Sequence, residues 1–181
     1  LIYLYSVNII NINKNHGVIK MNLEDKKALA YQFMINAVKT QAGQNIWVEH
    51  IGPKAKELAE VCAEIVKEAG ANASLIDSGA DFVNNVIGKM SPQELQQWGE
   101  ASLEKMKQTQ GYIRVCDDAD EEKIQISSEQ RSLYKKARRV FTDYRVNNTN
   151  WLVVSTPTEE FAKACNMDLK EFEDFYKKAC L

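Results

Sequence analysis

The chain has 181 residues, which is enough for one domain with a hydrophobic core. Hydrophobic residues make up 45% and charged residues 27%, as in ordinary soluble globular domains. The formal net charge of −2 gives no overall positive field that would attract nucleic acid or an anionic membrane. We therefore expect neither of these partners.

Residues 1–21 do not match a known targeting segment. Asn8, Asn11 and Asn13 interrupt the only apolar run, so it is neither a signal peptide nor long enough for a membrane span. We predict that residues 1–21 are an upstream tail outside the fold, and that residues 22–181 form one α/β domain. The alternative is that the tail contains an edge strand.

The first part of the domain is predicted to be a β-α-β unit. A helix over Asn22–Thr40, capped by Asn22, precedes a strand over Ile46–Ile51. Pro53 then opens an amphipathic helix that ends at Gly70, and a strand over Ala73–Ile76 follows directly. This spacing indicates that the two strands are parallel.

The middle of the chain alternates helices with a third strand. We predict a short helix over 81–87 and a longer helix that Ser91 and Glu94 open with a capping box. The apolar residues of Tyr112–Cys116 predict a strand, and Ser127 caps a long helix after it.

The last part of the chain is predicted to be a strand and two helices. The apolar run Trp151–Val154 is typical of a strand covered on both faces. Thr156 is predicted to cap the next helix, with Pro157 at its first position and Glu159 closing a capping box. The fold class is therefore α/β, with a mostly parallel sheet of about four strands flanked by helices.

The final helix is predicted to begin at Asp168, with Glu171 as its capping-box partner. Its apolar residues recur at helical spacing and should face the core: Phe172, Phe175, Tyr176 and Ala179. No Gly, Asn or Pro ends this helix before Leu181. We therefore expect that the sequence is truncated at its C-terminal end.

An acidic run follows the third predicted strand: Asp117, Asp118, Asp120, Glu121 and Glu122. Ligands bind at the carboxyl ends of strands in open α/β sheets, and carboxylates can hold Mg²⁺ or Ca²⁺. However, the spacing does not match a calcium-binding loop. We interpret the run as a solvated loop with acidic residues at a helix N-terminus.

The long helix before Trp151 carries a basic face, which could contact nucleic acid. Since neighbouring residues are acidic and the net charge is negative, we interpret it as a solvated helix face, with a partner contact as the alternative. Its residues are Arg131, Lys135, Lys136, Arg138, Arg139 and Arg145.

Gly52-Pro53, His50, Cys116 and Cys165 are weaker candidates for binding or catalytic sites. Gly52-Pro53 lacks the further glycines of a phosphate-binding turn, and Pro53 removes an N–H donor. His50 is interpreted as a structural or surface residue. Cys116 and Cys165 have no histidine nearby in the sequence, so neither is predicted to be a nucleophile.

Metal and redox chemistry are limited by composition. The chain has only two histidines, His16 and His50, so it cannot supply a histidine-rich metallopeptidase site. Its four cysteines form no Cys-x-x-Cys pair, and we interpret them as reduced, buried thiols of a cytoplasmic protein.

The end of the chain resembles the aminopeptidase T and aminopeptidase S family of metal-dependent exopeptidases. Weaker similarity extends over Gly52–Ala71 and the basic helix before Trp151, so that the resemblance spans about Asn22 to Leu181. The matching residues of the last block are Pro157, Thr158, Phe161, Ala162, Met167, Leu169, Glu171, Phe172, Glu173, Asp174, Phe175, Ala179 and Cys180.

The resemblance implies the N-terminal domain of a two-domain, usually homodimeric enzyme. Such an enzyme releases N-terminal residues from peptides with a water activated between two divalent metal ions, which are Zn²⁺, Co²⁺ or Mn²⁺. Family members are longer, and their metal ligands lie in a C-terminal half without a counterpart here. No catalytic, cofactor-binding or metal-binding residue is therefore assigned, and we expect no metal in this chain and no activity from it alone.

A second hypothesis needs no missing half. The chain would then be a standalone, non-catalytic α/β domain that binds a small molecule or a protein through its strand ends. The coding sequence downstream of residue 181 distinguishes the two hypotheses.

Overall fold

The computed structural model describes residues 21–181, without the side chains of Asp118, Ala119 and Glu121. Residues 1–20, on which the prediction of an upstream tail rests, lie outside the described residues. Met21 was also assigned to that tail, but its side chain is buried in the core and its backbone N–H donates to Glu173 Oε1 at 3.0 Å. The packed structure therefore includes Met21.

A four-stranded, fully parallel sheet forms the centre of the described structure. The strands are β1 (Asn45–Ile51), β2 (Asn72–Asp77), β3 (Gly111–Cys116) and β4 (Asn150–Ser155), in the order β2-β1-β3-β4. The predicted α/β fold class is confirmed. Each predicted strand lies within one or two residues of its observed bounds.

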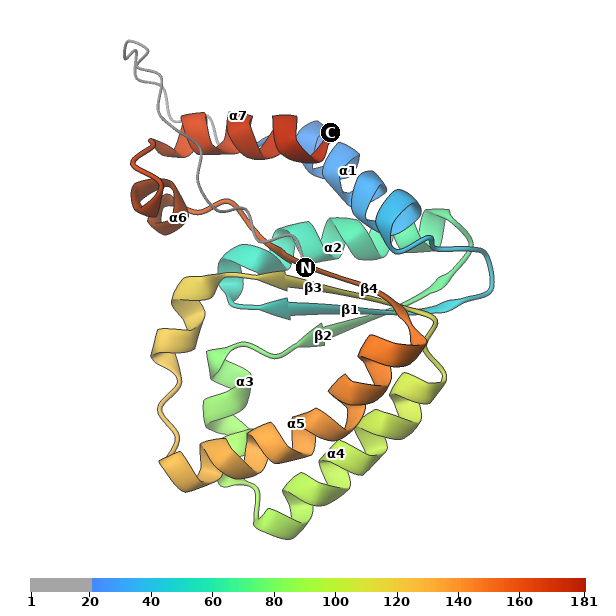
Figure 1. The fold of residues 1–181 in the computed structure, drawn as a ribbon, viewed down its shortest axis with the longest axis vertical. Helices are drawn as coiled ribbons and strands as arrows, with labels where there is room; N and C mark the ends of the chain where they lie inside the picture. Colours follow the sequence, from blue (N-terminus) through green and yellow to red (C-terminus); the bar gives the residue numbers. More distant parts are fainter. Residues whose placement is uncertain (1–20) are drawn as a thin grey trace.

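Helices cover both faces of the sheet (Figure 1). One face carries α1 (Leu23–Tyr31) with the π-helix η1 (Gln32–Ala37), α2 (Pro53–Glu68) and α7 (Leu169–Cys180). The other face carries α3 (Ala80–Asn85), α4 (Pro92–Lys107) and α5 (Ser128–Asn148). The short helices are η2 (Ile87–Lys89), η3 (Asp118–Lys123) and α6 (Glu159–Ala164).

The central strands are buried on both faces because each face packs on helices. Ile46 and Val48 of β1 point into the core formed with α1 and α2. Trp47 points the opposite way and stacks on Phe141 of α5, with ring centroids 5.9 Å apart. This explains why three consecutive residues of β1, Ile46, Trp47 and Val48, are apolar.

The prediction that the Trp151–Val154 strand is covered on both faces was wrong. β4 lies at the edge of the sheet, and none of its residues is fully buried. Leu152 and Val154 pack against the core, whereas the side chain of Val153 is 43% exposed.

Two predicted helices differ in local geometry. The predicted single helix over residues 22–40 changes at Gln32 into a π-helix, in which the Val38 N–H donates to the Phe33 carbonyl at 2.9 Å. The wider turn places both Phe33 and Val38 in the core. Thr156 is not the predicted N-cap, because its N–H still pairs with Cys116 of β3, and Thr158 caps α6 instead.

The apolar side of α7 is only partly covered. The predicted capping box of Asp168 and Glu171 is confirmed. However, the buried residue of this helix is Glu173, whereas Ala179 is exposed and Phe175 is 37% exposed. Of the predicted core face, Tyr176 packs against the core and Phe172 stacks on Phe161 of α6, and both are half-buried.

In the part of the chain that the structure describes, no helix combines the length and apolarity that a membrane crossing requires.

The contact between α4 and α5 depends on Gly99. An added Cβ there would lie 2.8 Å from the Ala137 carbonyl oxygen, a backbone atom that cannot move without shifting α5. We expect Gly99→Ala to destabilise the domain by about 1–3 kcal/mol, as overpacking usually does. Urea unfolding of this variant beside Gln97→Ala, an exposed position on the same helix, measures the effect. Equal stability of both variants would show that α4 and α5 are not packed so closely.

Candidate functional site

The candidate site is the edge of the sheet where the carboxyl ends of the strands meet. From β1 the chain passes to β2 on one side and then crosses back to β3 on the other side. Folds of this kind usually bind ligands outside the carboxyl ends at such a reversal. Gly52 follows β1 here, Ser78 and Gly79 follow β2, and Asp117 follows β3.

Backbone hydrogen bonds extend the strand pairing into this edge. Ser78 N–H donates to the His50 carbonyl at 3.0 Å, and Asp117 N–H donates to the Ile51 carbonyl at 2.8 Å. The loops after β2 and β3 therefore lie directly on either side of Gly52.

Gly52 and Gly79 allow two aspartates to fill the edge. A Cβ on Gly52 would lie 2.8 Å from the Cβ atoms of both Asp117 and Asp120. A Cβ on Gly79 would lie 2.9 Å from Asp120 Oδ2. Gly52 also has a φ of 84°, which side chains rarely adopt. Only 1% of Asp117 and 4% of Asp120 is exposed, so the usual binding crevice is filled by the chain itself.

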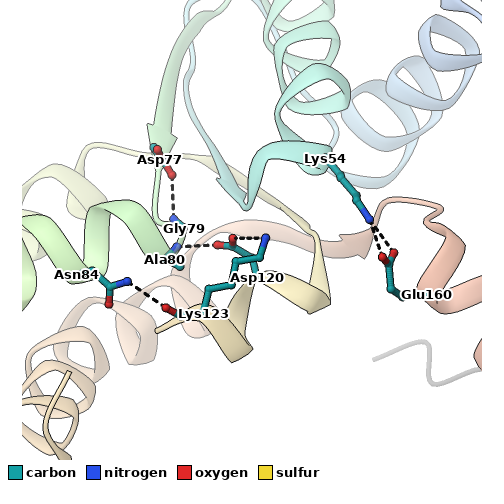
Figure 2. A network of polar contacts seen from close by, with 8 residues as sticks. All are labelled: Lys54, Asp77, Gly79, Ala80, Asn84, Asp120, Lys123 and Glu160. Atoms are coloured by element: carbon teal, nitrogen blue, oxygen red, sulfur yellow. Dashed lines mark hydrogen bonds and ion pairs between the residues drawn. The ribbon is translucent and has the colours of Figure 1, made fainter. Parts of the chain in front are cut away.

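Asp120 joins η3 to α3 (Figure 2). Its Oδ2 accepts a hydrogen bond from the Ala80 N–H at 2.6 Å, which is one of the amides that a helix N-terminus leaves unpaired. Lys123 Nζ lies 3.5 Å from Oδ1, and the Lys123 carbonyl accepts a hydrogen bond from Asn84 Nδ2 at 3.0 Å. The carboxylate thus takes the position that an anionic ligand would occupy on α3.

Asp117 is buried, and neither of its carboxylate oxygens has a hydrogen-bond partner among the described residues. Lys54, at the start of α2, interacts electrostatically with it. Lys54 Nζ is held by Glu160 at 2.7 Å (Figure 2). This hydrogen bond, with a smaller contribution from Asp117, raises the pKa of Lys54, and the contact with Lys54 lowers the pKa of Glu160 to about 2.

The predicted solvated acidic loop is therefore only partly confirmed. Glu122 is exposed, as predicted, whereas Asp117 and Asp120 are buried because η3 turns back into the sheet edge. The side chains of Asp118 and Glu121 lie outside the part of the chain that the structure describes.

His50 is a buried residue at the end of β1. Its Nδ1 lies 3.9 Å from Asp77 Oδ1, too far for a hydrogen bond, and has no other partner in the described structure. Asp77 Oδ1 instead accepts from the Gly79 N–H at 2.8 Å. Within residues 21–181 no three His, Cys, Asp or Glu side chains are grouped so that they could hold a metal ion.

A buried ionic cluster is centred on Glu49 of β1 and was not predicted from the sequence. Only 2% of this residue is exposed. Its carboxylate accepts hydrogen bonds from Arg114 Nε at 2.9 Å, from Arg138 Nη2 at 3.0 Å and from the Tyr112 hydroxyl. Burial alone would raise the pKa of Glu49, but the two guanidinium groups outweigh it and lower this pKa to about 2.

This cluster corrects the prediction of a fully solvated basic face. Arg138 turns inward to Glu49. Arg145 is buried between the rings of Tyr112 and Trp151, with its guanidinium carbon 4.4 and 4.9 Å from their centroids. Lys135, Lys136 and Arg139 are exposed, as predicted.

Among the described residues, the four cysteines form no disulfide bond. Cys62 is buried, and burial raises its pKa to about 12. Cys165 is exposed, and Cys116 and Cys180 are half-buried, so the prediction of buried thiols is confirmed only for Cys62. The prediction that Cys116 and Cys165 are not nucleophiles stays a prediction.

Comparison with known proteins gives a match of fold. No family model and no curated protein matches the sequence. AmpT from Thermus thermophilus, an aminopeptidase, has a similar structure with a TM-score of 0.57 at 16% sequence identity. The match covers 87% of this chain but only 42% of the AmpT chain. At this identity it shows a shared aminopeptidase-like α/β fold and no more.

A second solved structure, the CurK enoyl reductase, is much less similar. Its TM-score is 0.29 at 10% identity, with 87% of this chain and 50% of the reductase chain covered. A similarity this low supports no argument about fold or function.

The Glu49 cluster predicts a specific dependence of stability on mutation and pH. Glu49→Gln should destabilise the domain by about 3–5 kcal/mol at neutral pH, because two buried guanidinium groups lose their counter-ion. Asp117→Asn should cause no comparable loss, because the buried carboxylate that it replaces has no hydrogen-bond partner.

The folded-state pKa of Glu49 is about 2, below the ordinary value of 4.5. Ionised Glu49 therefore makes its full contribution to the free energy of unfolding above pH 4.5. This contribution, on the order of 3 kcal/mol in total, is lost as the pH falls toward 2. Urea unfolding of the wild type and Glu49→Gln across this range should show converging stabilities. A constant difference between them would contradict the assigned ion pairs.

Proposed function

We propose that this chain is a non-catalytic N-terminal domain of a metal-dependent aminopeptidase, with the metal ligands supplied by residues outside it. The observation that carries the proposal is the fold shared with AmpT, which covers most of this chain and less than half of AmpT. The resemblance of the Pro157–Cys180 segment to aminopeptidases T and S supports the same conclusion.

The site geometry agrees with a domain that does not itself perform the chemistry. A two-metal centre needs several open ligands that converge on the ions. At the sheet edge, Asp120 already accepts the Ala80 N–H, and His50 and Asp77 are 3.9 Å apart beside Gly79. The residues described here therefore do not fit the two divalent ions of such an enzyme, and no reaction step is assigned to them.

The remaining parts of the proposal follow from the same kinship. The complete protein would act on the free N-terminus of peptides, as a cytoplasmic homodimer, with Zn²⁺, Co²⁺ or Mn²⁺ as its metal. The second hypothesis, a standalone domain that binds through its strand ends, would require η3 to leave the edge that Asp117 and Asp120 fill.

Peptidase assays test this proposal. The 181-residue chain should release no N-terminal residues from unblocked peptides, with or without added Zn²⁺, Co²⁺ or Mn²⁺. A protein extended by the downstream coding sequence should release them in a metal-dependent manner, and N-acetylated peptides serve as the control substrate.

Two results would contradict the proposal. The first is metal-dependent release by the 181-residue chain itself, which would place the active site within it. The second is a stop codon directly after Leu181 in the natural gene, which would favour a standalone domain.

A further inference from the structure

A basic hollow lies beside the first two turns of α5. It has a volume of about 480 Å³ and is lined by Ile126, Ser128, Arg131, Ser132 and Lys135. Four of these residues follow helical spacing, with intervals of three, four and seven residues from Ser128, so they share one side of α5. The hollow is separate from the sheet edge and from the Glu49 cluster.

The polar residues that line this hollow all have side chains that can donate hydrogen bonds, and none is acidic. They are two serines, one arginine and one lysine. Glu129, the acidic residue of the first turn of α5, is exposed and does not line the hollow. The hollow is therefore positively charged although the chain as a whole is not.

Arg131 is held in place at this hollow. Its Nη2 donates to the Ile124 carbonyl at 3.2 Å, and the side chain is half-buried. The start of α5 is fixed as well, because Gln130 Nε2 donates to the carbonyls of Ile87 and Met90 at 2.6 and 2.8 Å. A guanidinium oriented in advance loses less entropy when it binds an oxyanion.

We propose that this hollow binds the phosphate group of a small phosphomonoester. A phosphate dianion presents several acceptor oxygens, which match the Arg131 guanidinium, the Lys135 ammonium and the two serine hydroxyls. The space exceeds that of a phosphate alone, and Ile126 supplies an apolar wall for the organic part of the ligand. The site is independent of peptidase activity in the complete protein.

Titration of the 181-residue chain with phenyl phosphate, followed by NMR, tests the proposal. The amides of Ser128, Arg131, Ser132 and Lys135 should shift together and saturate in the millimolar range. Inorganic phosphate should shift the same amides with weaker affinity, since it makes no contact with Ile126. Phenol, which lacks the phosphate, should leave them unchanged.

Two charge reversals on neighbouring exposed lysines give a matched comparison. Lys135→Glu places a carboxylate in the hollow and should weaken phenyl phosphate binding by about tenfold or more, as expected for loss of a charge-assisted hydrogen bond. Lys136→Glu makes the same charge change outside the hollow and should weaken binding by less than about threefold at the same salt concentration. Both positions are exposed, so both variants should fold.

The proposal fails if phenyl phosphate produces no saturable shift, or if the two variants weaken binding equally. Equal weakening would mean non-specific attraction to the basic helix. Equal affinity for phenyl phosphate and inorganic phosphate would contradict the proposed contact between the phenyl ring and Ile126. If that contact exists, Ile126→Ala should abolish the preference for phenyl phosphate over inorganic phosphate.

Discussion

The close packing of Asp117 and Asp120 against Gly52 and Gly79 is the constraint on which the functional interpretation depends. Successive strands are added on one side of β1 and then on the other, so the strand order reverses between β1 and β3. Such a reversal leaves a crevice at the carboxyl edge of the sheet, and crevices of this kind usually hold ligands. In this chain, η3 returns into the crevice, and the carboxylates of Asp117 and Asp120 are buried there. A side chain at either glycine would collide with these aspartates. The polypeptide thus closes the edge that would usually bind a ligand. This agrees with the proposal that the domain is non-catalytic and acts together with residues outside it.

Glu49 directly precedes His50 on β1, and its ion pair with Arg138 connects the sheet to α5. A single buried carboxylate holds two guanidinium groups from different elements, and Arg145 adds a third positive charge between two aromatic rings. Such a cluster contributes little net stability compared with apolar packing, but breaking it is costly. It therefore fixes the position of α5, and with it the orientation of the basic residues on the outer side of that helix.

Local patterns in the sequence predicted the elements, because caps and periodicity depend on near neighbours. The boxes at Ser91 and Asp168 and all four strands are examples. The exposure of β4 could not be predicted in this way, since it depends on the strand order. Nor could the partners of Arg138, because Glu49 lies 89 residues away in the sequence. The run after β3 was predicted to follow a strand, as it does, but the burial of Asp117 and Asp120 depends on Gly52 and Gly79, which follow other strands.

Hydrogen exchange at the Ala80 amide tests the closed edge most directly. Ala80 begins α3, and an amide at this position has no acceptor within its own helix. Any protection must therefore come from Asp120, whose Oδ2 accepts this N–H at 2.6 Å. We predict that the Ala80 amide is protected in the wild type and loses its protection in Asp120→Ala, while amides in the centre of β1 stay protected in both. Exchange of the wild-type Ala80 amide at the rate of a free, solvated amide would show that the edge is open.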